Sequence, residues 1–340
     1  MKTPLSSLVQ LLEAEHYSSC MILSQPPIYS LYGESLQREL QQLLPTFYHL
    51  VPCGESLKNI ESATACWQAM HQQGLDRRSL VVAIGGGALT DLAGFVAACY
   101  MRGIDVVYIP TTLMGMVDAA IGGKTGVNLP SGKNLVGVFR KPKQVIIRSD
   151  YLKTLPKREF CSGLAEVIKY GVIWDPTFFT YLEENMDVLL ERNETVLRYV
   201  VERSYQIKNE IVEQDVQENG LRAILNWGHT FAHALETLTD YQQYTHGEAV
   251  SIGMCCAARV SAHLGYVDQN FVERQHKLCQ RAGLQKELPS DVSIERLVEC
   301  MKRDKKAVAQ HISLVIANGM GQVELVVNVD PNMILEALTS

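Results

Sequence analysis

The first half of the chain alternates short apolar runs with longer segments of helical periodicity. Apolar runs of this length, bounded by glycine, proline or polar residues, are typical of strands buried in a parallel sheet. They predict strands at Met21–Leu23, Phe47–Val51, Leu80–Ile84, Asp105–Ile109 and Val145–Ile147. Between them, an apolar stripe at helical spacing predicts helices over Ser56–Gln73 and Leu89–Tyr100. The alternation predicts an open, mostly parallel α/β sheet.

The pattern changes near Leu152 to Arg158, after which apolar residues follow helical spacing in long blocks. The predicted helices are Arg158–Ile173, Met186–Val216, Trp227–Leu238, Glu248–His263, Asp268–Ala282 and Ile294–Arg303. Near the end, Ile312–Ile316 and Val323–Val329 flank Asn318-Gly-Met-Gly321, which predicts a β-hairpin. Because 340 residues exceed the usual size of one core, we predict two domains, an α/β domain over 1–157 and a mostly helical domain over 158–340.

Composition excludes several classes of protein. A hydrophobic content of 47% with 20% charged residues is typical of a soluble globular protein. The net charge of −6 and the absence of long basic runs argue against a nucleic-acid partner. No apolar stretch reaches transmembrane length and no signal peptide is evident, so we expect no membrane partner and a cytoplasmic location. The nine cysteines are irregularly spaced without a C-x-x-C pair, which favours reduced thiols.

Two glycine-rich segments follow predicted strands and are suited to binding phosphate. Gly85-Gly86-Gly87 opens a predicted helix, where backbone N–H groups and the helix dipole favour an anion. The dinucleotide fingerprint is incomplete, because Thr90 stands where its last glycine belongs. The segment 110–134 adds hydroxyls, an acid and Gly122-Gly123-Lys124, and its spacing disfavours a P-loop. These segments predict a phosphate-binding edge of the sheet, with a structural tight turn as the alternative.

Three histidines lie close together in the sequence of the helical half. His229 and His233 are four residues apart, so on a helix they share one face, as paired zinc ligands do. His246 begins a second apolar stretch and is able to turn back onto the first. On another predicted helix, Glu166 and Lys169 form either a surface salt bridge or, if that face is buried, Glu166 completes a His/His/Glu metal site. The residues alone leave these alternatives open.

An ordered series of motifs runs through most of the chain and resembles the 3-dehydroquinate synthase family of sugar-phosphate cyclases. The motifs are Gly85-Gly-Gly-x-x-x-Asp91, Tyr100-Met-Arg-Gly103, Pro110-Thr-Thr-Leu113, Val117-Asp-Ala-x-Ile-Gly-Gly-Lys-Thr-Gly-Val-Asn128, Gly132-Lys-Asn134, Thr154-Leu-Pro-x-Arg-Glu159, Leu164-Ala-Glu-Val-Ile-Lys-Tyr-Gly171, Leu225-Asn-x-Gly-His-Thr-x-x-His233 and His246-Gly-Glu-Ala-Val250.

The resemblance implies an enzyme of the shikimate pathway, a carbon–oxygen lyase that cyclises 3-deoxy-D-arabino-heptulosonate 7-phosphate with loss of phosphate. It implies an N-terminal domain that binds NAD and a C-terminal domain that binds Zn²⁺, with Co²⁺ as a possible replacement. The substrate is a small sugar acid phosphate. The resemblance also implies a homodimer.

Matched position by position, the family's metal ligands fall on Glu166, His229 and His246, which leaves His233 as a catalytic residue. Other residues implied at the substrate are Asp118, Lys124, Asn134, Lys169, Lys208, Arg222, Asn226 and one of Lys305 or Lys306. Arg102 matches an arginine that reaches the site of the neighbouring subunit. The residues implied at NAD are Glu55, Lys58, Gly86, Gly87, Asp91, Thr111, Thr112, Asp118, Lys124 and Lys133.

Two other enzymes remain as alternatives. A metal-dependent dehydrogenase of the glycerol type shares the expected architecture and releases reduced cofactor, but Lys208, Arg222 and the segment 304–306 are suited to a phosphate that such an enzyme does not bind. A sister cyclase would make an inosose or a valiolone from a different sugar phosphate. Asn226 and His233 favour the dehydroquinate synthase. A non-catalytic binding protein is the third class, and it predicts no activity to lose.

Overall fold

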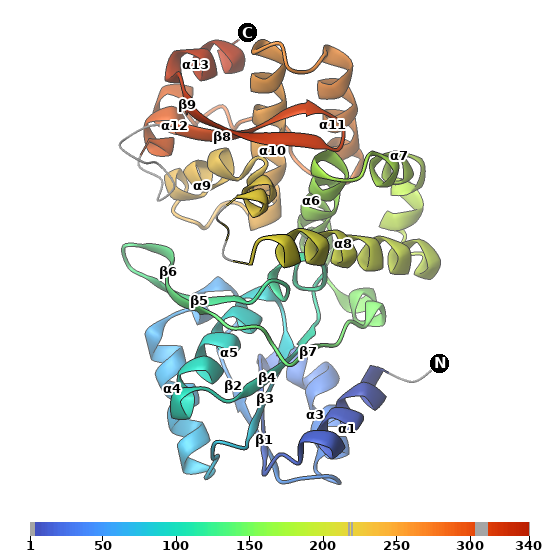
Figure 1. Ribbon diagram of the computed structural model, residues 1–340, viewed down its shortest axis with the longest axis vertical. Coiled ribbons are helices and arrows are strands. Elements are labelled where there is room, and N and C mark those ends of the chain that lie inside the picture. Colours follow the sequence, from blue (N-terminus) through green and yellow to red (C-terminus); the bar gives the residue numbers. More distant parts are fainter. Residues whose placement is uncertain (1–3, 217, 219, 303–311, 340) are drawn as a thin grey trace. The chain divides into compact units, whose positions relative to one another are not determined.

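The computed structural model describes residues 4–216, 218, 220–302 and 312–339. It consists of two compact units, Met1–Leu155 and Pro156–Ser340, which are drawn as ribbons in Figure 1. Lys305 and Lys306 lie outside the described residues. Among the residues described, no helix is long and apolar enough to cross a membrane.

Unit 1 is built on a five-stranded, wholly parallel sheet with the strand order β2-β1-β3-β4-β7. The parallel sheet that the sequence predicts is therefore confirmed. The strands are β1 (Cys20–Ser24), β2 (Thr46–Leu50), β3 (Leu80–Gly85), β4 (Asp105–Pro110) and β7 (Gln144–Val145). Every residue of β1 and β3 is buried, because helices cover both faces of the sheet and both faces of each strand are apolar.

Helices flank this sheet, with α4 and α5 to one side of it and α1 and α3 to the other (Figure 1). The helices of unit 1 are α1 (Pro4–Glu15), α2 (Pro26–Ile28), α3 (Glu34–Leu40), α4 (Ile60–Gln72) and α5 (Gly87–Cys99), with short helical turns η1 (Tyr29–Gly33), η2 (Glu55–Leu57), η3 (Tyr100–Arg102), η4 (Gly115–Ala119) and η5 (Ser149–Thr154). The predicted helix over Ser56–Gln73 begins later, at Ile60, because the side chain of Asn59 caps the backbone N–H of Ser62.

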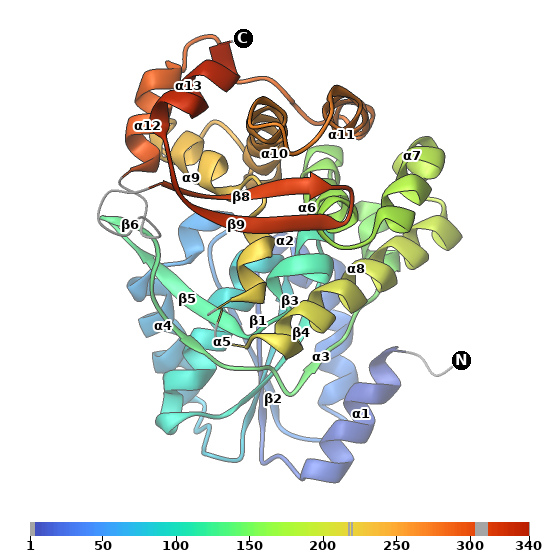
Figure 2. The same cartoon turned by 45° about the horizontal axis from the view of Figure 1, so that its top comes forward.

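A β-hairpin that is not among the predicted elements lies beside α5 (Figure 2). Its antiparallel strands are β5 (Lys124–Leu129) and β6 (Gly132–Phe139). Gly126 and Gly137 pair across it, and a Cβ added at Gly126 would stand 2.6 Å from the carbonyl oxygen of Val136. The glycines therefore allow the two strands to approach each other closely.

Unit 2 is mostly helical, as predicted. Its helices are α6 (Lys157–Ile173), α7 (Pro176–Leu190), α8 (Glu194–Gln214), α9 (His229–Leu238), α10 (His246–His263), α11 (Gln269–Arg281), α12 (Ile294–Met301) and α13 (Pro331–Thr339), with the turn η6 (Leu221–Asn226) before α9. The single helix predicted over Met186–Val216 is wrong. The chain breaks there because Arg192 has a φ of +61° and the Asn193 side chain caps the start of α8.

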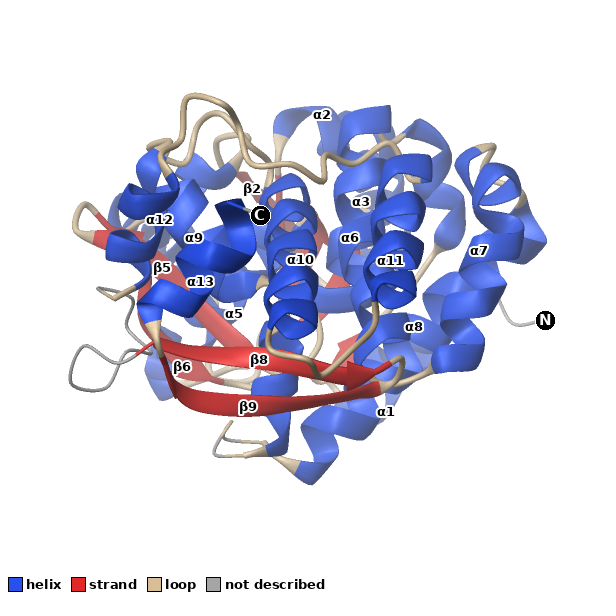
Figure 3. Ribbon diagram, turned by 90° about the horizontal axis from the view of Figure 1, so that it is seen from above, coloured by secondary structure: helices blue, strands red, loops and turns tan. Residues whose placement is uncertain are grey.

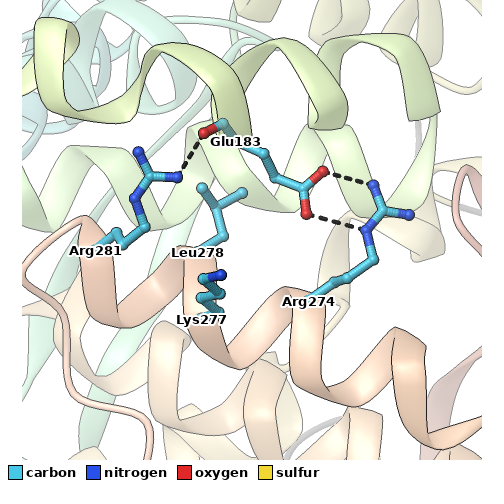
Figure 4. A pocket seen from close by; sticks show the side chains of 5 residues that line it. All are labelled: Glu183, Arg274, Lys277, Leu278 and Arg281. Atoms are coloured by element: carbon cyan, nitrogen blue, oxygen red, sulfur yellow. Dashed lines mark hydrogen bonds and ion pairs between the residues drawn. The ribbon is translucent and has the colours of Figure 1, made fainter.

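The packing of α7 on α11 is fixed by ion pairs (Figure 4). The carboxylate of Glu183 accepts two hydrogen bonds from Arg274, at 3.0 and 2.6 Å, and Arg281 donates to the carbonyl of Glu183 and to Asp187. A cavity of about 80 Å³ lies between these side chains. Because carboxylates and a carbonyl already engage both guanidinium groups, we assign this cavity to helix packing and to no ligand.

The predicted hairpin near the end of the chain is confirmed. Strands β8 (Ile312–Gly319) and β9 (Gln322–Val329) are antiparallel, and β8 packs on α10 (Figure 3). Most of β8 is buried and most of β9 is exposed, so β8 contributes to the core of unit 2 and β9 covers it.

Candidate functional site

A carboxylate and two imidazoles converge inside unit 2. Glu166 on α6, His229 at the start of α9 and His246 at the start of α10 each offer one ligand atom, and these atoms all lie within 4.8 Å of one another. The Oε1 atom of Glu166 is 3.5 Å from Nε2 of His229 and 3.8 Å from Nε2 of His246. Glu166 is fully buried, and His246 is the most exposed of the three at 37%.

Three glycines allow the helices that carry these residues to pack closely. A Cβ added at Gly247 would overlap the carbonyl oxygen of Ser162 on α6, and one at Gly253 would overlap the carbonyl oxygen of Gly228. Gly228 itself precedes α9 with a φ of +76°, and a Cβ there would stand 2.5 Å from the backbone nitrogen of Met254. The backbones of α6, α9 and α10 are thus too close together at these positions to admit a side chain. This close packing brings the three ligand atoms together.

Both imidazoles are oriented through Nδ1. The Nδ1 atom of His229 lies 3.2 Å from the carbonyl oxygen of Trp227, which accepts its proton, and that of His246 lies 3.4 Å from Oε1 of Glu236. With Nδ1 protonated, the lone pair of a neutral imidazole is on Nε2, and both Nε2 atoms face Glu166. Burial lowers the pKa of His229 well below its ordinary value of 6.5, so the ring stays neutral at neutral pH.

The cluster fits a divalent cation. Neither buried oxygen of Glu166 accepts a hydrogen bond, and the carboxylate is ion-paired with Lys169. Oxygen and imidazole lone pairs that face one another at this range repel, and a cation between them turns the repulsion into coordination. Two imidazole nitrogens and one carboxylate are the protein ligands of many catalytic zinc sites.

His233 lies next to the cluster and outside the group of three. Its ring centroid is 5.7 Å from that of His229, edge to face, and the ligand group contains His246 in its place. Spacing alone left a pair of ligands at His229 and His233 open. The structure instead groups His229 with Glu166 on α6 and His246 on α10.

Three predicted substrate residues of unit 2 are buried cations. Lys169 on α6, Lys208 on α8 and Arg222 in η6 are 1%, 6% and 2% exposed, and these three elements pack against one another. Nearby, the Asn226 side chain donates to Glu218 at 3.1 Å. Ammonium and guanidinium groups form strong hydrogen bonds with phosphate and carboxylate oxygens, so this arrangement suits an anionic ligand.

In unit 1 the predicted phosphate-binding turn lies between β3 and α5. Gly86 is the N-cap of α5 and has no side-chain cap, so the first N–H groups of the helix suit an anion. A Cβ at Gly87 would stand 2.6 Å from that of Ala119, and one at Gly86 would stand 3.2 Å from Cγ2 of Thr112. The glycines let the turn lie directly against the segment that follows β4.

Lys58 contacts two other predicted cofactor residues and Asn134, which was predicted at the substrate. Its ammonium group donates to Asp91 at 2.8 Å and to Asn134 at 2.6 Å, and it lies 3.6 Å from Glu55. Lys58 is only 4% exposed, and these neighbours raise its pKa although burial opposes them. We call Lys58 with Glu55, Asp91 and Asn134 the Lys58 node. Beside it is a cavity of about 260 Å³, lined by Glu55, Ser56, Lys58, Asn59, Ile60, Glu61, Asn128, Leu129 and Pro130.

The remaining predicted residues of unit 1 are spread along the segment after β4 and the hairpin. Thr111 is buried, and the hydroxyl of Thr112 accepts the backbone N–H of Gly115 at 3.0 Å. Asp118 lies in η4, Lys124 begins β5 and Lys133 lies in β6. Arg102 is exposed, and its φ of +69° follows one of +51° at Met101.

The sequence reading missed Glu236, which is 3% exposed and contacts His246. A signal for it was present, because residues 229, 233 and 236 lie on one face of a helix.

Comparison with known proteins shows which family the chain belongs to. The family model described as 3-dehydroquinate synthase N-terminal matches residues 48–162, and the model described as 3-dehydroquinate synthase C-terminal matches residues 163–307. The chain belongs to the 3-dehydroquinate synthase family. The resemblance inferred from the motifs is therefore confirmed.

Relatives of this family align along nearly the whole chain. The 3-dehydroquinate synthase of Thermoanaerobacter pseudethanolicus is 45% identical over 309 residues, which are 91% of this chain and 86% of that protein. The 3-dehydroquinate synthase of Synechocystis sp. is 45% identical over 308 residues, 90% of this chain and 85% of that protein.

Solved structures of sugar-phosphate cyclases have the same fold, which confirms the predicted fold class. A 2-epi-5-epi-valiolone synthase from Streptomyces hygroscopicus subsp. jinggangensis, with NAD⁺ and Zn²⁺ bound, is similar with a TM-score of 0.88 and 30% identity, covering 96% of this chain and 92% of that one. A 2-deoxy-scyllo-inosose synthase with carbaglucose-6-phosphate, NAD⁺ and Co²⁺ is similar with a TM-score of 0.85 at 22% identity, covering 99% and 94%.

Proposed function

We propose that the protein is a 3-dehydroquinate synthase. It converts 3-deoxy-D-arabino-heptulosonate 7-phosphate to 3-dehydroquinate and phosphate by oxidation, phosphate elimination, reduction, ring opening and aldol cyclisation. The observation that carries the proposal is the convergence of Glu166, His229 and His246 in a chain of this family. The buried cations of unit 2 add support, because the substrate carries a phosphate and a carboxylate.

Glu166, His229 and His246 are proposed to hold Zn²⁺ or Co²⁺, and the turn at Gly86 with the Lys58 node is proposed to hold NAD. When bound, NAD provides a reversible hydride acceptor and the divalent cation polarises a substrate hydroxyl. Other residues proposed to contact NAD are Gly87, Asp91, Thr111, Thr112, Asp118, Lys124, Lys133 and Glu55. The boundary between an NAD-binding domain over 1–157 and a metal- and substrate-binding domain over 158–340 is part of this proposal.

The cations of unit 2 bind and orient the anionic ends of the substrate. A guanidinium and two ammonium groups that are already buried need little reorganisation when phosphate or carboxylate oxygens replace water beside them. Fixing both ends of a linear sugar acid reduces the entropy that its cyclisation costs. Lys169 is also ion-paired with Glu166, so it links these cations to the candidate metal ligands.

His233 is the proposed proton carrier. It lies beside His229 and does not belong to the ligand group, a place that suits a residue that accepts a proton from the substrate and returns it. Imidazole groups serve in many enzymes as both general base and general acid, which covers both directions of transfer.

We also propose a cytoplasmic homodimer in which Arg102 reaches the substrate of the neighbouring subunit. Support comes from the exposed left-handed turn at Met101 and Arg102. Mixing Arg102→Ala with His233→Ala protein provides a test. If sites are shared, mixed dimers contain one intact site and recover activity, whereas unshared sites stay inactive.

Release of inorganic phosphate from the heptulosonate phosphate is the decisive measurement. We expect release with catalytic NAD, loss of release with a chelator and recovery on adding Zn²⁺. Glucose 6-phosphate and a heptulose 7-phosphate without the carboxylate serve as alternative substrates. Faster turnover of either would make the protein a sister cyclase, and stoichiometric NADH formation would make it a dehydrogenase of the glycerol type.

A further inference from the structure

Glu236 is a carboxylate that unit 2 buries on the last turn of α9. It is 3% exposed and lies on the helix face that also carries His229 and His233. Burying a carboxylate costs free energy unless hydrogen-bond donors or positive charge compensate it. Its Oε1 atom lies 3.4 Å from Nδ1 of His246, so the imidazole of a candidate metal ligand is one of its partners.

His246 needs such a partner more than His229 does. His229 is 12% exposed, and its Nδ1 is held by the carbonyl of Trp227 at 3.2 Å. His246 is 37% exposed and is the first residue of α10, so packing restrains its ring less. The contact with Glu236 fixes both the rotation of this ring and the tautomer that presents Nε2 to Glu166.

The two anchors also differ in charge. A backbone carbonyl is a neutral acceptor, whereas a carboxylate is an anionic one and makes the opposite ring nitrogen a stronger donor to a cation. We infer that Glu236 is a positioning residue, which holds His246 through Nδ1 and strengthens its Nε2 as a ligand for the divalent cation. This inference rests on the metal site of the proposed function.

Two substitutions separate the charge of Glu236 from its hydrogen bond. Glu236→Gln keeps an oxygen that accepts from Nδ1 and removes the charge, and Glu236→Ala removes both. We expect Zn²⁺ affinity, measured by competition with a chromophoric chelator, to fall in the order unsubstituted, Gln, Ala, with a loss of about 10- to 100-fold for Ala.

Glu248→Gln is the matched control. Glu248 lies two residues from His246, and its carboxylate is engaged by Arg158 at 2.8 Å and by the backbone of Thr245. The control removes a carboxylate charge from the first turn of α10, close to His246, without removing the anchor of His246. We expect its Zn²⁺ affinity to stay within about twofold of the unsubstituted protein, because the guanidinium of Arg158 already compensates the charge of Glu248.

A spectroscopic readout separates positioning from structural damage. In the Co²⁺-loaded protein the visible absorption bands report ligand geometry, so they should shift in the Glu236 variants and stay unchanged in Glu248→Gln. If the variants do not fold, histidine ring ¹⁵N spectra of the unsubstituted Zn²⁺ protein test the same point. They should show His246 protonated at Nδ1 and bound through Nε2, and binding through Nδ1 overturns the inference.

The outcomes distinguish this inference from the proposed function. If the unsubstituted protein binds no divalent cation, the proposed metal site is wrong. If it binds Zn²⁺ and Glu236→Ala binds it equally tightly with identical Co²⁺ bands, the metal site stands and the role of Glu236 is wrong.

Discussion

Gly247 lies so close to Ser162 that a Cβ at position 247 would overlap the carbonyl oxygen of Ser162. This contact joins the start of α10 to α6, and it places His246, the residue before Gly247, beside Glu166. The glycine is therefore part of the candidate metal site although it offers no ligand atom.

Gly247→Ala should weaken both the fold and the site. The overlap forces α10 away from α6, and we expect the free energy of unfolding to fall by about 1–3 kcal/mol with a parallel loss of Zn²⁺ affinity. Glu273→Ala, at an exposed position of α11, is the control. Urea unfolding of the metal-free proteins and chelator competition measure the two effects. Equal Zn²⁺ affinity in Gly247→Ala would contradict the role given to this contact.

Glu166→Gln should abolish tight metal binding while the protein stays folded. The amide is isosteric and neutral, so the cluster loses its anionic ligand and Lys169 loses its ion-pair partner. Loss of a residue that only holds a metal ligand in place costs about 10- to 100-fold in affinity. We expect the loss of a ligand itself to lower Zn²⁺ affinity at least about 100-fold, and phosphate release to fall with it. Glu159→Gln, in the exposed first turn of the same helix, should behave like the unsubstituted protein.

Lys58→Met should lower both the affinity for NAD and the stability of the fold. The change removes a buried cation that Asp91, Asn134 and Glu55 share, and we expect unfolding to become easier by about 1–3 kcal/mol. NAD affinity, measured by titration calorimetry, should fall at least about tenfold, which corresponds to 1.4 kcal/mol. Lys141→Met, at an exposed position of the same unit, should leave both quantities unchanged. Unaltered NAD binding in Lys58→Met would argue that the node only stabilises the fold.

The ion pair between Glu248 and Arg158 should make stability depend on pH. Partial burial opposes ionisation of Glu248, but hydrogen bonds from Arg158 and the backbone of Thr245 outweigh it and lower the pKa of the carboxyl below 4.5. Because the folded state lowers this pKa, its contribution is present above about pH 4.5 and is lost as pH falls through the lowered value. Glu248→Gln should therefore be less stable than the unsubstituted metal-free protein at pH 7, and the difference should shrink in acid. If the difference in stability between the two proteins persists at pH 3, the contribution of Glu248 comes from capping α10 and not from its charge.

The sequence predicted the elements whose apolar pattern is strong. The strands that became β1, β3 and β4 have apolar residues at nearly every position, and the structure buries them completely or almost so. The hairpin of β8 and β9 was predicted because Gly319 and Gly321 punctuate two apolar runs. Where one side of an element is partly polar, as in β7, only Gln144–Val145 pairs with the sheet.

The misread elements depend on contacts that a sequence pattern does not contain. The hairpin of β5 and β6 was not predicted, because the close approach of Gly126 and Gly137 is known only once the two strands are paired. The break after α7 depends on the positive φ of Arg192, and no strong breaker marks it in the sequence. The grouping of His229 with His246 and Glu166, in place of His233, requires the packing of three helices and came from the resemblance to a family, because spacing favoured the pair on α9.

The anchor behind His229 has an optical consequence. Trp227 is completely buried; its carbonyl holds His229, and its indole N–H lies 3.3 Å from Oε1 of Gln275. The chain has three tryptophans, and the other two, Trp67 and Trp174, are partly exposed. Buried tryptophans emit at shorter wavelengths than exposed ones, so the short-wavelength part of the fluorescence comes from Trp227, next to the candidate metal ligand His229. Co²⁺ titrated into the protein should quench that blue component first, which allows occupancy to be followed without a label.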